Sequence, residues 1–171
     1  DRHEMAACLD YAYAARGPVY LRIGKSNCGD VHSVPIDNLQ TGRLIKLRDG
    51  RSDRPGLIAT GSMVRAATDI AQPRELTVWS APFIKPLSVD DVRTAARSCS
   101  SLVTLEEHSV LNGLGAAVTE ITSEHSPTQV LRIGVPDRFS EYCGTYDYLL
   151  FEHGIDIEAV ARRIDDFITA A

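Results

Sequence analysis

The stretch LVTLEEHSVLNGLGAAVTEI, residues 102–121, sets the pattern for the chain around it. It opens on a short apolar run, which predicts a buried strand at 101–105. It closes on residues with helical spacing, which predict a helix at 113–124. The glycines between them permit positive φ and a close approach of two backbones, so the stretch predicts a strand that turns directly into a helix.

The same alternation continues on both sides of this stretch. Apolar runs predict further strands at 57–60, 76–81 and 129–133, and helical spacing predicts further helices after Ser62, after Ser88 and at 157–167. Short strands of the buried type that alternate with helices are typical of an α/β protein. The expected fold is a three-layer, mostly parallel sheet with helices on both faces.

Two serines are expected to begin helices. Ser62 follows Gly61 and is predicted to be a helix N-cap rather than a catalytic nucleophile. Ser88 has Asp91 three residues further on, which resembles a capping box. Val89, Val92 and Ala96 are expected to face inward from that second helix.

The first 51 residues do not fit this alternation. Four apolar residues share one helical face at the start of the chain: Met5, Cys8, Leu9 and Ala12. Gly17 and Pro18 end that helix before a strand predicted at 19–23. A lone helix and strand cannot bury both of their apolar faces, so this start is expected to be the torn edge of a larger domain. Residues 24–56 are expected to form a surface linker with one strand or hairpin at 43–47.

Composition places the protein among ordinary globular domains. The 171 residues carry a net charge of −5 and are 44% hydrophobic, and no apolar run approaches the length of a membrane span. This composition argues against nucleic-acid and membrane partners. The four cysteines form no CxxC pair and are expected to be free intracellular thiols in a cytoplasmic protein.

Several residues of the opening stretch could have a structural, an interface or a catalytic role. These residues are Glu106, Glu107, His108, Asn112, Gly113 and Gly115. Glu106 or Glu107 could accept hydrogen bonds from the unpaired N–H groups of the following helix, which is a structural role. The end of a strand in an α/β sheet is also where partners and ligands dock, so an interface or a catalytic role stays open. No HxxxH pair, Walker A or G-x-G-x-x-G motif occurs, so no metal or phosphate-loop site is predicted.

Five segments in order resemble the C-terminal part of transketolase-like, thiamine-diphosphate-dependent enzymes. They are GPVYLRIGK, LIATGSMVRAA, FIKPLSVDDV, LVTLEEHSVLNGLGAAVTEI and LRIGVPDRFSEYCGT. The chain most resembles the short C-terminal subunit of bacterial split transketolases. It is similar, to a lesser degree, to deoxyxylulose-phosphate synthase and to the β subunits of 2-oxo acid dehydrogenases.

The resemblance implies a division of the chain and a missing cofactor site. Residues 1–25 correspond to the tail of a pyrimidine-binding domain, 26–51 to a linker and 52–171 to the C-terminal domain. The family's GDG and NN motif has no counterpart here, and its catalytic glutamate would lie before residue 1. The chain alone is therefore expected to bind neither thiamine diphosphate nor Mg²⁺, although the assembled enzyme would use both ligands. It is also expected to hold no catalytic, cofactor-binding or metal-binding residue.

Two basic residues are candidates for a substrate contact, again by resemblance. Lys25 stands where related enzymes carry a basic residue that contacts the phosphate of a sugar phosphate, and Arg22 could support it. A lysine retains the charge without the bidentate fork of arginine. A solvated lysine at a strand end is the alternative.

The sequence departs from the family in two places. Asn112 replaces a usual glycine, and asparagine also tolerates the left-handed conformation. Tyr142 and Cys143 stand in a loop where small and acidic residues are more usual.

The predicted function is that of a transketolase-like subunit that helps to transfer a two-carbon ketol unit and is inactive alone. Its partners would be further copies of itself or an N-terminal transketolase subunit, and residues 106–115 would serve packing and subunit contact. The alternatives are a non-catalytic docking domain, as in 2-oxo acid dehydrogenases, and part of a deoxyxylulose-phosphate synthase.

Overall fold

The computed structural model describes residues 1–24 and 28–170. Its elements are α1 (Arg2–Ala14), β1 (Ile45–Arg48), β2 (Gly56–Ala59), α2 (Met63–Ala71), the 3-10 helix η1 (Gln72–Arg74), β3 (Thr77–Ser80), α3 (Val89–Ser98), β4 (Leu102–Ser109), α4 (Leu114–His125), β5 (Val130–Val135), α5 (Tyr146–His153) and α6 (Ile157–Ala170).

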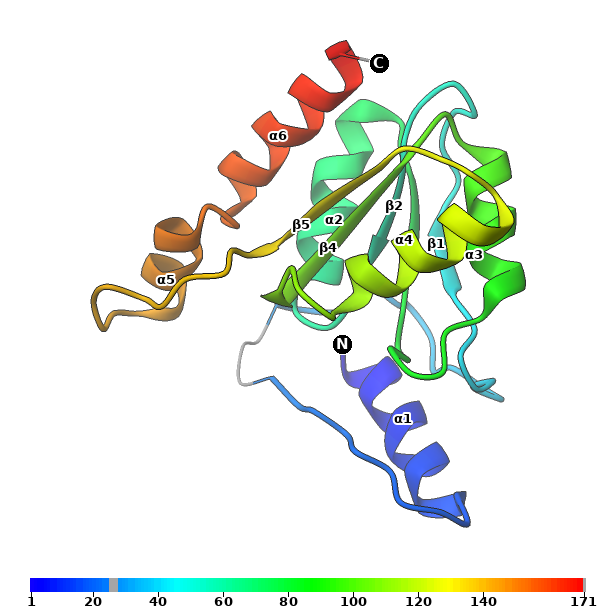
Figure 1. Cartoon of the computed structure of the whole chain (residues 1–171). Helices are drawn as coiled ribbons and strands as arrows, with labels where there is room; N and C mark the ends of the chain where they lie inside the picture. Colours follow the sequence, from blue (N-terminus) through cyan, green and yellow to red (C-terminus); the bar gives the residue numbers. More distant parts are fainter. Residues whose placement is uncertain (25–27, 171) are drawn as a thin grey trace.

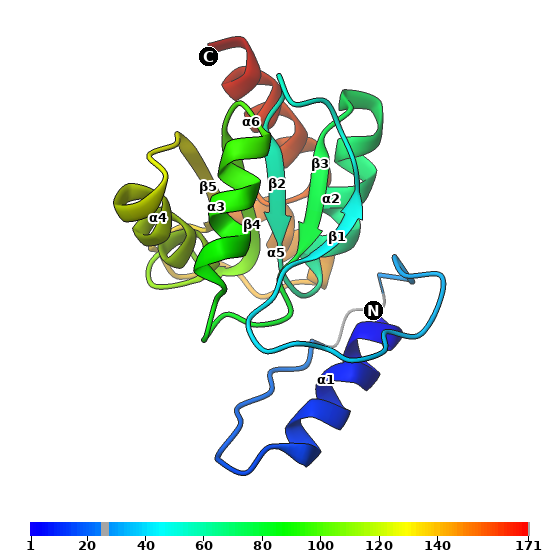
Figure 2. The same cartoon turned by 90° about the vertical axis from the view of Figure 1, so that its right-hand side faces the viewer.

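The strands form one five-stranded sheet in the order β1-β3-β2-β4-β5. The β2–β3, β2–β4 and β4–β5 pairs are parallel, and only β1 joins antiparallel, beside β3. Helices α2 and α6 cover one face of the sheet, and α3 and α4 cover the other (Figures 1 and 2). The predicted three-layer α/β class is confirmed.

Two separate apolar layers hold the helices on the sheet. On one face, Val64, Ala67, Val160 and Ile164 pack on the buried side chains of the central strands. On the other face, Val92 and Ala96 of α3 and Leu114 and Val118 of α4 pack around Ile58 and Trp79. Because successive strand residues point to opposite faces, strands that are covered on both sides read as continuous apolar runs.

Helix α3 begins as predicted, with one difference in its cap. The Ser88 hydroxyl accepts a hydrogen bond from the Asp91 backbone N–H at 3.2 Å. The Asp91 carboxylate does not accept a hydrogen bond from the Ser88 backbone N–H, as a full capping box would require, because that N–H donates to the Gly42 carbonyl oxygen. The carboxylate instead accepts from Arg43 Nε at 2.6 Å and from the Leu44 N–H at 2.9 Å, which fastens the approach to β1 onto this helix.

The predicted strand at 19–23 is wrong, since residues 18–24 belong to no strand. Val19, Tyr20 and Ile23 are exposed, and no strand among the described residues lies beside them to complete a ladder. The predicted apolar face of α1 is only partly covered: Met5, Cys8 and Ala12 are half-buried and Leu9 is 48% exposed, while the buried residues of the helix are Glu4 and Ala7.

Other differences are local. The predicted strand at 43–47 lies at 45–48 as β1. Val89, predicted to face inward, is exposed at the first position of α3, and Ile157, an apolar residue that begins the helix predicted at 157–167, is exposed at the first position of α6. Helix α5 was not predicted, because its polar and aromatic residues have little helical periodicity. The four cysteines are free, as expected.

No helix in the described part of the chain combines the length and the apolar character that crossing a membrane would require.

Candidate functional site

The carboxyl edge of the sheet has a reversal of strand order between β2 and β4. The chain runs from β2 outward to β3, and then returns past β2 to β4 on its other side. In open α/β sheets the carboxyl ends of the strands at such a reversal are the usual place for a site. The loop after β2 and the end of β4 meet there, and these segments hold Ser62, Glu106 and Glu107.

Glu106 is a buried carboxylate that caps helix α4. Its Oε2 accepts from the Leu114 N–H and its Oε1 from the Gly115 N–H, both at 2.8 Å. The first N–H groups of a helix have no partner within the helix, and a negative charge there also complements the helix dipole. The structural role proposed for one of the two glutamates therefore belongs to Glu106.

The glycines of this turn are required by space. A Cβ on Gly113 would overlap the Glu106 carboxylate, and one on Gly115 would lie 2.7 Å from Thr104 Oγ1. The φ of Gly113 is −98°, which other residues also adopt. The left-handed residue of the turn is Asn112, with φ of 59°, as its tolerance of that conformation predicts.

Glu107 points to the opposite face from Glu106 and connects three elements. Its Oε2 accepts from the hydroxyl of Ser62 at the start of α2 and from the hydroxyl of Tyr146 in α5, the latter at 2.8 Å. Ser62 lies at the N-cap position of α2, as predicted, but its hydroxyl makes no cap hydrogen bond. A carboxylate that accepts from two hydroxyls of its own chain ties elements together.

His108 lies apart from these contacts. Its side chain is about half exposed, and Nδ1 lies 2.9 Å from the Ser109 carbonyl oxygen and 3.9 Å from Glu106 Oε2. No nucleophile contacts its ring among the described residues.

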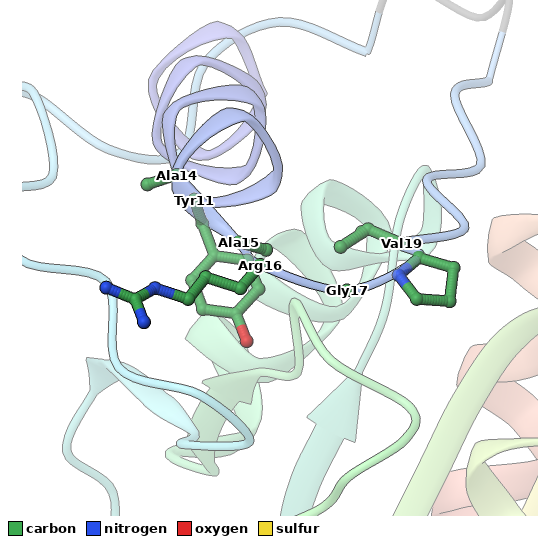
Figure 3. A pocket seen from close by; sticks show the side chains of 7 residues that line it. Tyr11, Ala14, Ala15, Arg16, Gly17 and Val19 are labelled. Atoms are coloured by element: carbon green, nitrogen blue, oxygen red, sulfur yellow. The ribbon is translucent and has the colours of Figure 1, made fainter.

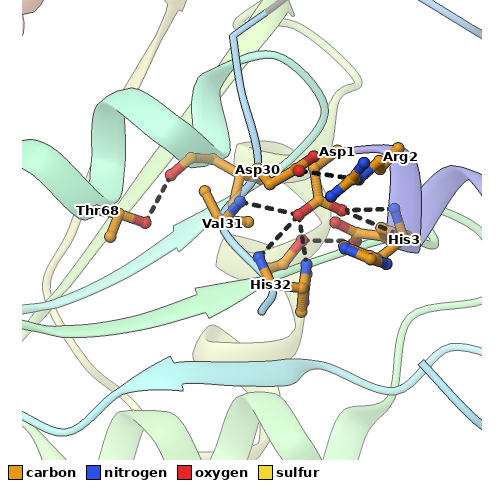
Figure 4. Close-up of polar contacts among 10 residues, drawn as sticks. Asp1, Arg2, His3, Asp30, Val31, His32 and Thr68 are labelled. Atoms are coloured by element: carbon orange, nitrogen blue, oxygen red, sulfur yellow. Dashed lines mark hydrogen bonds and ion pairs between the residues drawn. The ribbon is translucent and has the colours of Figure 1, made fainter. Parts of the chain in front are cut away.

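A second polar cluster attaches the N-terminal segment beneath the same edge of the sheet (Figure 2). Glu4 of α1 is buried and accepts from the hydroxyl of Ser80, at the end of β3, at 2.6 Å. The Asp1 carboxylate accepts from the N–H groups of His3 and Glu4 and from those of Val31 and His32, at 2.7–3.1 Å (Figure 4).

This cluster was not predicted, because Asp1 and His32 are 31 residues apart and show no periodic relation. His32 Nδ1 lies 3.0 Å from Asp1 Oδ2. Burial lowers the pKa of His32, and the nearby Glu4 carboxylate partly offsets that shift.

Asp1, Glu4 and His32 are also close enough together to be considered as metal ligands. Among the described residues, their possible ligand atoms all lie within 4.8 Å of one another. The two oxygens of Asp1 already face four backbone N–H groups and an imidazole nitrogen, and a carboxylate has about four lone-pair sites. The Asp1 carboxylate is therefore already held by hydrogen bonds from its own chain, and it has few lone pairs left to coordinate a metal cation.

The candidate phosphate contacts lie elsewhere. Lys25 falls outside the described residues. Arg22 is exposed on the extended segment after α1 and has no carboxylate partner among the described residues. A pocket of about 400 Å³ lies at the end of α1, lined by Tyr11, Ala14, Ala15, Arg16, Gly17, Pro18 and Val19 (Figure 3). Its lining includes neither Arg22 nor any carboxylate.

These features define a class of protein: a mostly parallel α/β domain with a buried glutamate that caps the helix after its fourth strand. The chain belongs to the transketolase C-terminal domain family, whose model matches residues 47–160.

Relatives in sequence match almost the whole chain. It is 33% identical over 166 residues to a 1-deoxy-D-xylulose-5-phosphate synthase of Dechloromonas aromatica, with 96% of this chain and 26% of the relative covered. It is 35% identical over 176 residues to the enzyme of the same name from Chlorobium luteolum, with 98% and 27% covered. The chain thus spans about a quarter of the length of these relatives.

Solved structures share the fold. A split-gene transketolase, described as an inactive β4 tetramer, matches with a TM-score of 0.87 and 32% identity over 99% of this chain and 55% of its own. A transketolase from Campylobacter jejuni matches with a TM-score of 0.51 and 15% identity over 84% of this chain and 20% of its own, which bears on the fold alone.

Proposed function

We propose that this chain is the C-terminal part of a transketolase-like enzyme that transfers a two-carbon ketol unit between sugar phosphates. The observation that carries the proposal is the fit to the split-gene transketolase over almost the entire chain, N-terminal segment included. That protein is a split-gene transketolase described as an inactive β4 tetramer, and this chain covers 55% of the matched chain.

The division of the chain follows from this proposal. Residues 1–25 would be the tail of a pyrimidine-binding domain, 26–51 a linker and 52–171 the C-terminal domain. The uncovered residues Leu9, Val19 and Ile23 support the first assignment, because a larger domain would bury them. Strand β1 lies in the linker range and pairs with β3, so the linker would be tied to the domain at its end.

We infer that the chain supplies no ligand to thiamine diphosphate or Mg²⁺. Two pockets of 370–400 Å³ are lined by apolar and basic residues without a carboxylate, whereas Mg²⁺ prefers carboxylate oxygens. The cofactor, when bound to the assembled enzyme, would supply the stabilised carbanion. This chain would supply subunit contacts with further copies or with an N-terminal transketolase subunit in the cytoplasm.

Arg22 and Lys25 remain the proposed contacts to a substrate phosphate. The exposure of Arg22 and the lack of a described carboxylate partner support the proposal, because its guanidinium is available to an anion. Changing Arg22 to Gln in the assembled enzyme should raise KM for a sugar phosphate about ten-fold with kcat retained. The exposed Arg97 of α3, changed to Gln, is the control.

The decisive experiment compares the chain alone with the chain mixed with an N-terminal transketolase subunit. Ketol transfer only in the mixture, and heat of thiamine-diphosphate binding only in the mixture, would support the proposal. Ketol transfer or cofactor binding by the chain alone would contradict it. A mixture that assembles without activity would instead favour the docking role.

A second candidate function is deoxyxylulose-phosphate synthesis. It is favoured by the names of the sequence relatives, which match this chain at 33–35% identity. Decarboxylation of pyruvate by the assembled protein in the presence of a triose phosphate would identify this activity, and its absence beside ketol transfer would exclude it.

A further inference from the structure

The outer edge of strand β5 presents backbone groups that no strand of the described residues covers. Its opposite edge pairs with β4, where the Gln129 and Val135 carbonyl oxygens accept from Leu102 and Val110 at 3.0 Å. Backbone groups of successive strand residues alternate in direction, so those of Arg132 and Gly134 point away from β4. Helix α6 lies with α2 on one face of the sheet and is near enough to this edge for Arg163 to reach β5 (Figures 1 and 2).

Two guanidinium groups converge on this edge from different elements. Arg163 of α6 donates from Nη2 to the Arg132 carbonyl oxygen at 3.2 Å, and Arg132 of β5 donates from Nη1 to the Val110 carbonyl oxygen at 3.2 Å. Both contacts leave the remaining N–H groups of each guanidinium available, since arginine has five donors. A pocket of about 370 Å³ lies between them, lined by Val110, Arg132, Gly134, Pro136, His153 and Arg163.

The charge of this pocket is not balanced within the described part of the chain. Neither Arg132 nor Arg163 has a carboxylate within ion-pair distance there, whereas Arg74, Arg51 and Arg43 are each paired. His153 adds an imidazole whose Nδ1 is buried without a hydrogen-bond partner, while its Nε2 lies 2.8 Å from the Ser140 hydroxyl. No carboxylate lines the pocket.

We propose that this pocket binds the phosphate group of a small anionic ligand. Two arginine forks match the geometry of phosphate oxygens, and a backbone N–H from Gly134 at the free edge adds a neutral donor. The site is separate from the Glu106 and Glu107 contacts and does not depend on the proposed ketol transfer. The competing explanation is that the arginines only cover an edge strand and prevent pairing with another chain.

Inorganic phosphate is the probe for the test, titrated into the protein at constant ionic strength and followed by amide and side-chain NMR shifts. We expect saturable shifts at Gly134 and His153. Arg132→Gln and Arg163→Gln should each weaken phosphate binding about ten-fold. Arg162→Gln is the matched control, because Arg162 is the neighbouring exposed arginine of α6 and does not line the pocket.

Three results would overturn the proposal. Shifts that do not saturate, or that spread over basic side chains generally, would mean nonspecific screening. Equal binding by the native protein and both variants would leave the arginines with the edge-covering role alone. Acetate that saturates the same shifts as tightly as phosphate would contradict a phosphate site. The titration of the native protein decides the matter even where a variant loses its fold.

Discussion

Glu106 brings a carboxylate into the interior of the domain, where only 2% of its surface meets solvent. Two backbone N–H groups of α4 donate hydrogen bonds to it there, both at 2.8 Å. Glu107 is next to Glu106 in the sequence, but its side chain lies on the other side of the sheet, because alternate residues of β4 face opposite sides.

Removal of the Glu106 carboxylate should destabilise the protein substantially. Glu106→Ala leaves the Leu114 and Gly115 N–H groups buried without an acceptor, which is expected to cost about 2–4 kcal/mol of unfolding free energy. Urea denaturation measures the change. Glu120→Ala, at an exposed position of the same helix, is the control, and an equal loss in both variants would contradict the capping role.

The glycine that precedes α4 is a second residue with a steric requirement. Gly113→Ala should destabilise the protein by about 1–3 kcal/mol, because its Cβ would displace the Glu106 carboxylate. Gly17→Ala is the matched control, since a Cβ at Gly17 meets no atom within 4 Å. Thermal unfolding of the two variants tests this, and a neutral Gly113→Ala would show that the turn adjusts at little cost.

At the scale of elements, α6 is held to the neighbouring helices by an ion pair as well as by its apolar stripe. Arg74 of η1 contacts Asp165 of α6 through two hydrogen bonds, both 2.7 Å. The hydrogen bond from Arg74 lowers the pKa of Asp165 below its ordinary value of 3.8. Because Asp165 is half exposed, solvent screening limits the contribution of the pair to less than about 1 kcal/mol.

The pH dependence of this contribution has a defined sign. A carboxyl group with a lowered folded-state pKa stabilises the fold above its unfolded pKa and loses that contribution as the pH falls through its folded pKa. Arg74→Gln should therefore be less stable than the native protein above about pH 4, and the gap should close at lower pH. Urea unfolding over pH 2–7 measures the gap. The same gap in an Asp165→Asn background would contradict the assignment.

At the scale of the whole molecule, the N-terminal segment is attached by polar contacts and only lightly by apolar ones. Glu4 reaches the end of β3, and Asp1 gathers the N–H groups of Val31 and His32. Leu9 of α1 and the apolar residues at 19–23 are exposed and are left for another surface to cover.

Loss of the Glu4 contact should loosen this segment selectively. Glu4→Ala leaves the buried Ser80 hydroxyl without its acceptor and should speed hydrogen exchange throughout α1, with exchange in β2 and β4 unchanged. Asp10→Ala, at an exposed position of α1, is the control. Faster exchange across the whole sheet would instead mean that α1 and the sheet unfold as one unit.

Helices α2, α3, α4 and α6 could be predicted because each has apolar residues at helical spacing. Strands β2, β3, β4 and β5 could be predicted because sheets covered on both faces have short continuous apolar runs. The cap of α3 could be predicted because it depends on residues within three positions. The left-handed conformation of Asn112 was expected because the family that the chain resembles has a glycine there. The family resemblance rested on longer motifs of the same local kind.

Other features depend on residues that meet only after folding. Whether Glu106 or Glu107 would cap α4 depended on which face of β4 each occupies. Ser62 stands at its predicted N-cap position, but its hydroxyl bonds to Glu107 instead of to the first turn of α2. The Asp1–His32 cluster and the Arg132–Arg163 pocket join residues about 31 positions apart with no shared period. The predicted strand at 19–23 has the apolar pattern of a strand but no neighbour among the described residues, and a strand needs a partner to complete its hydrogen bonds.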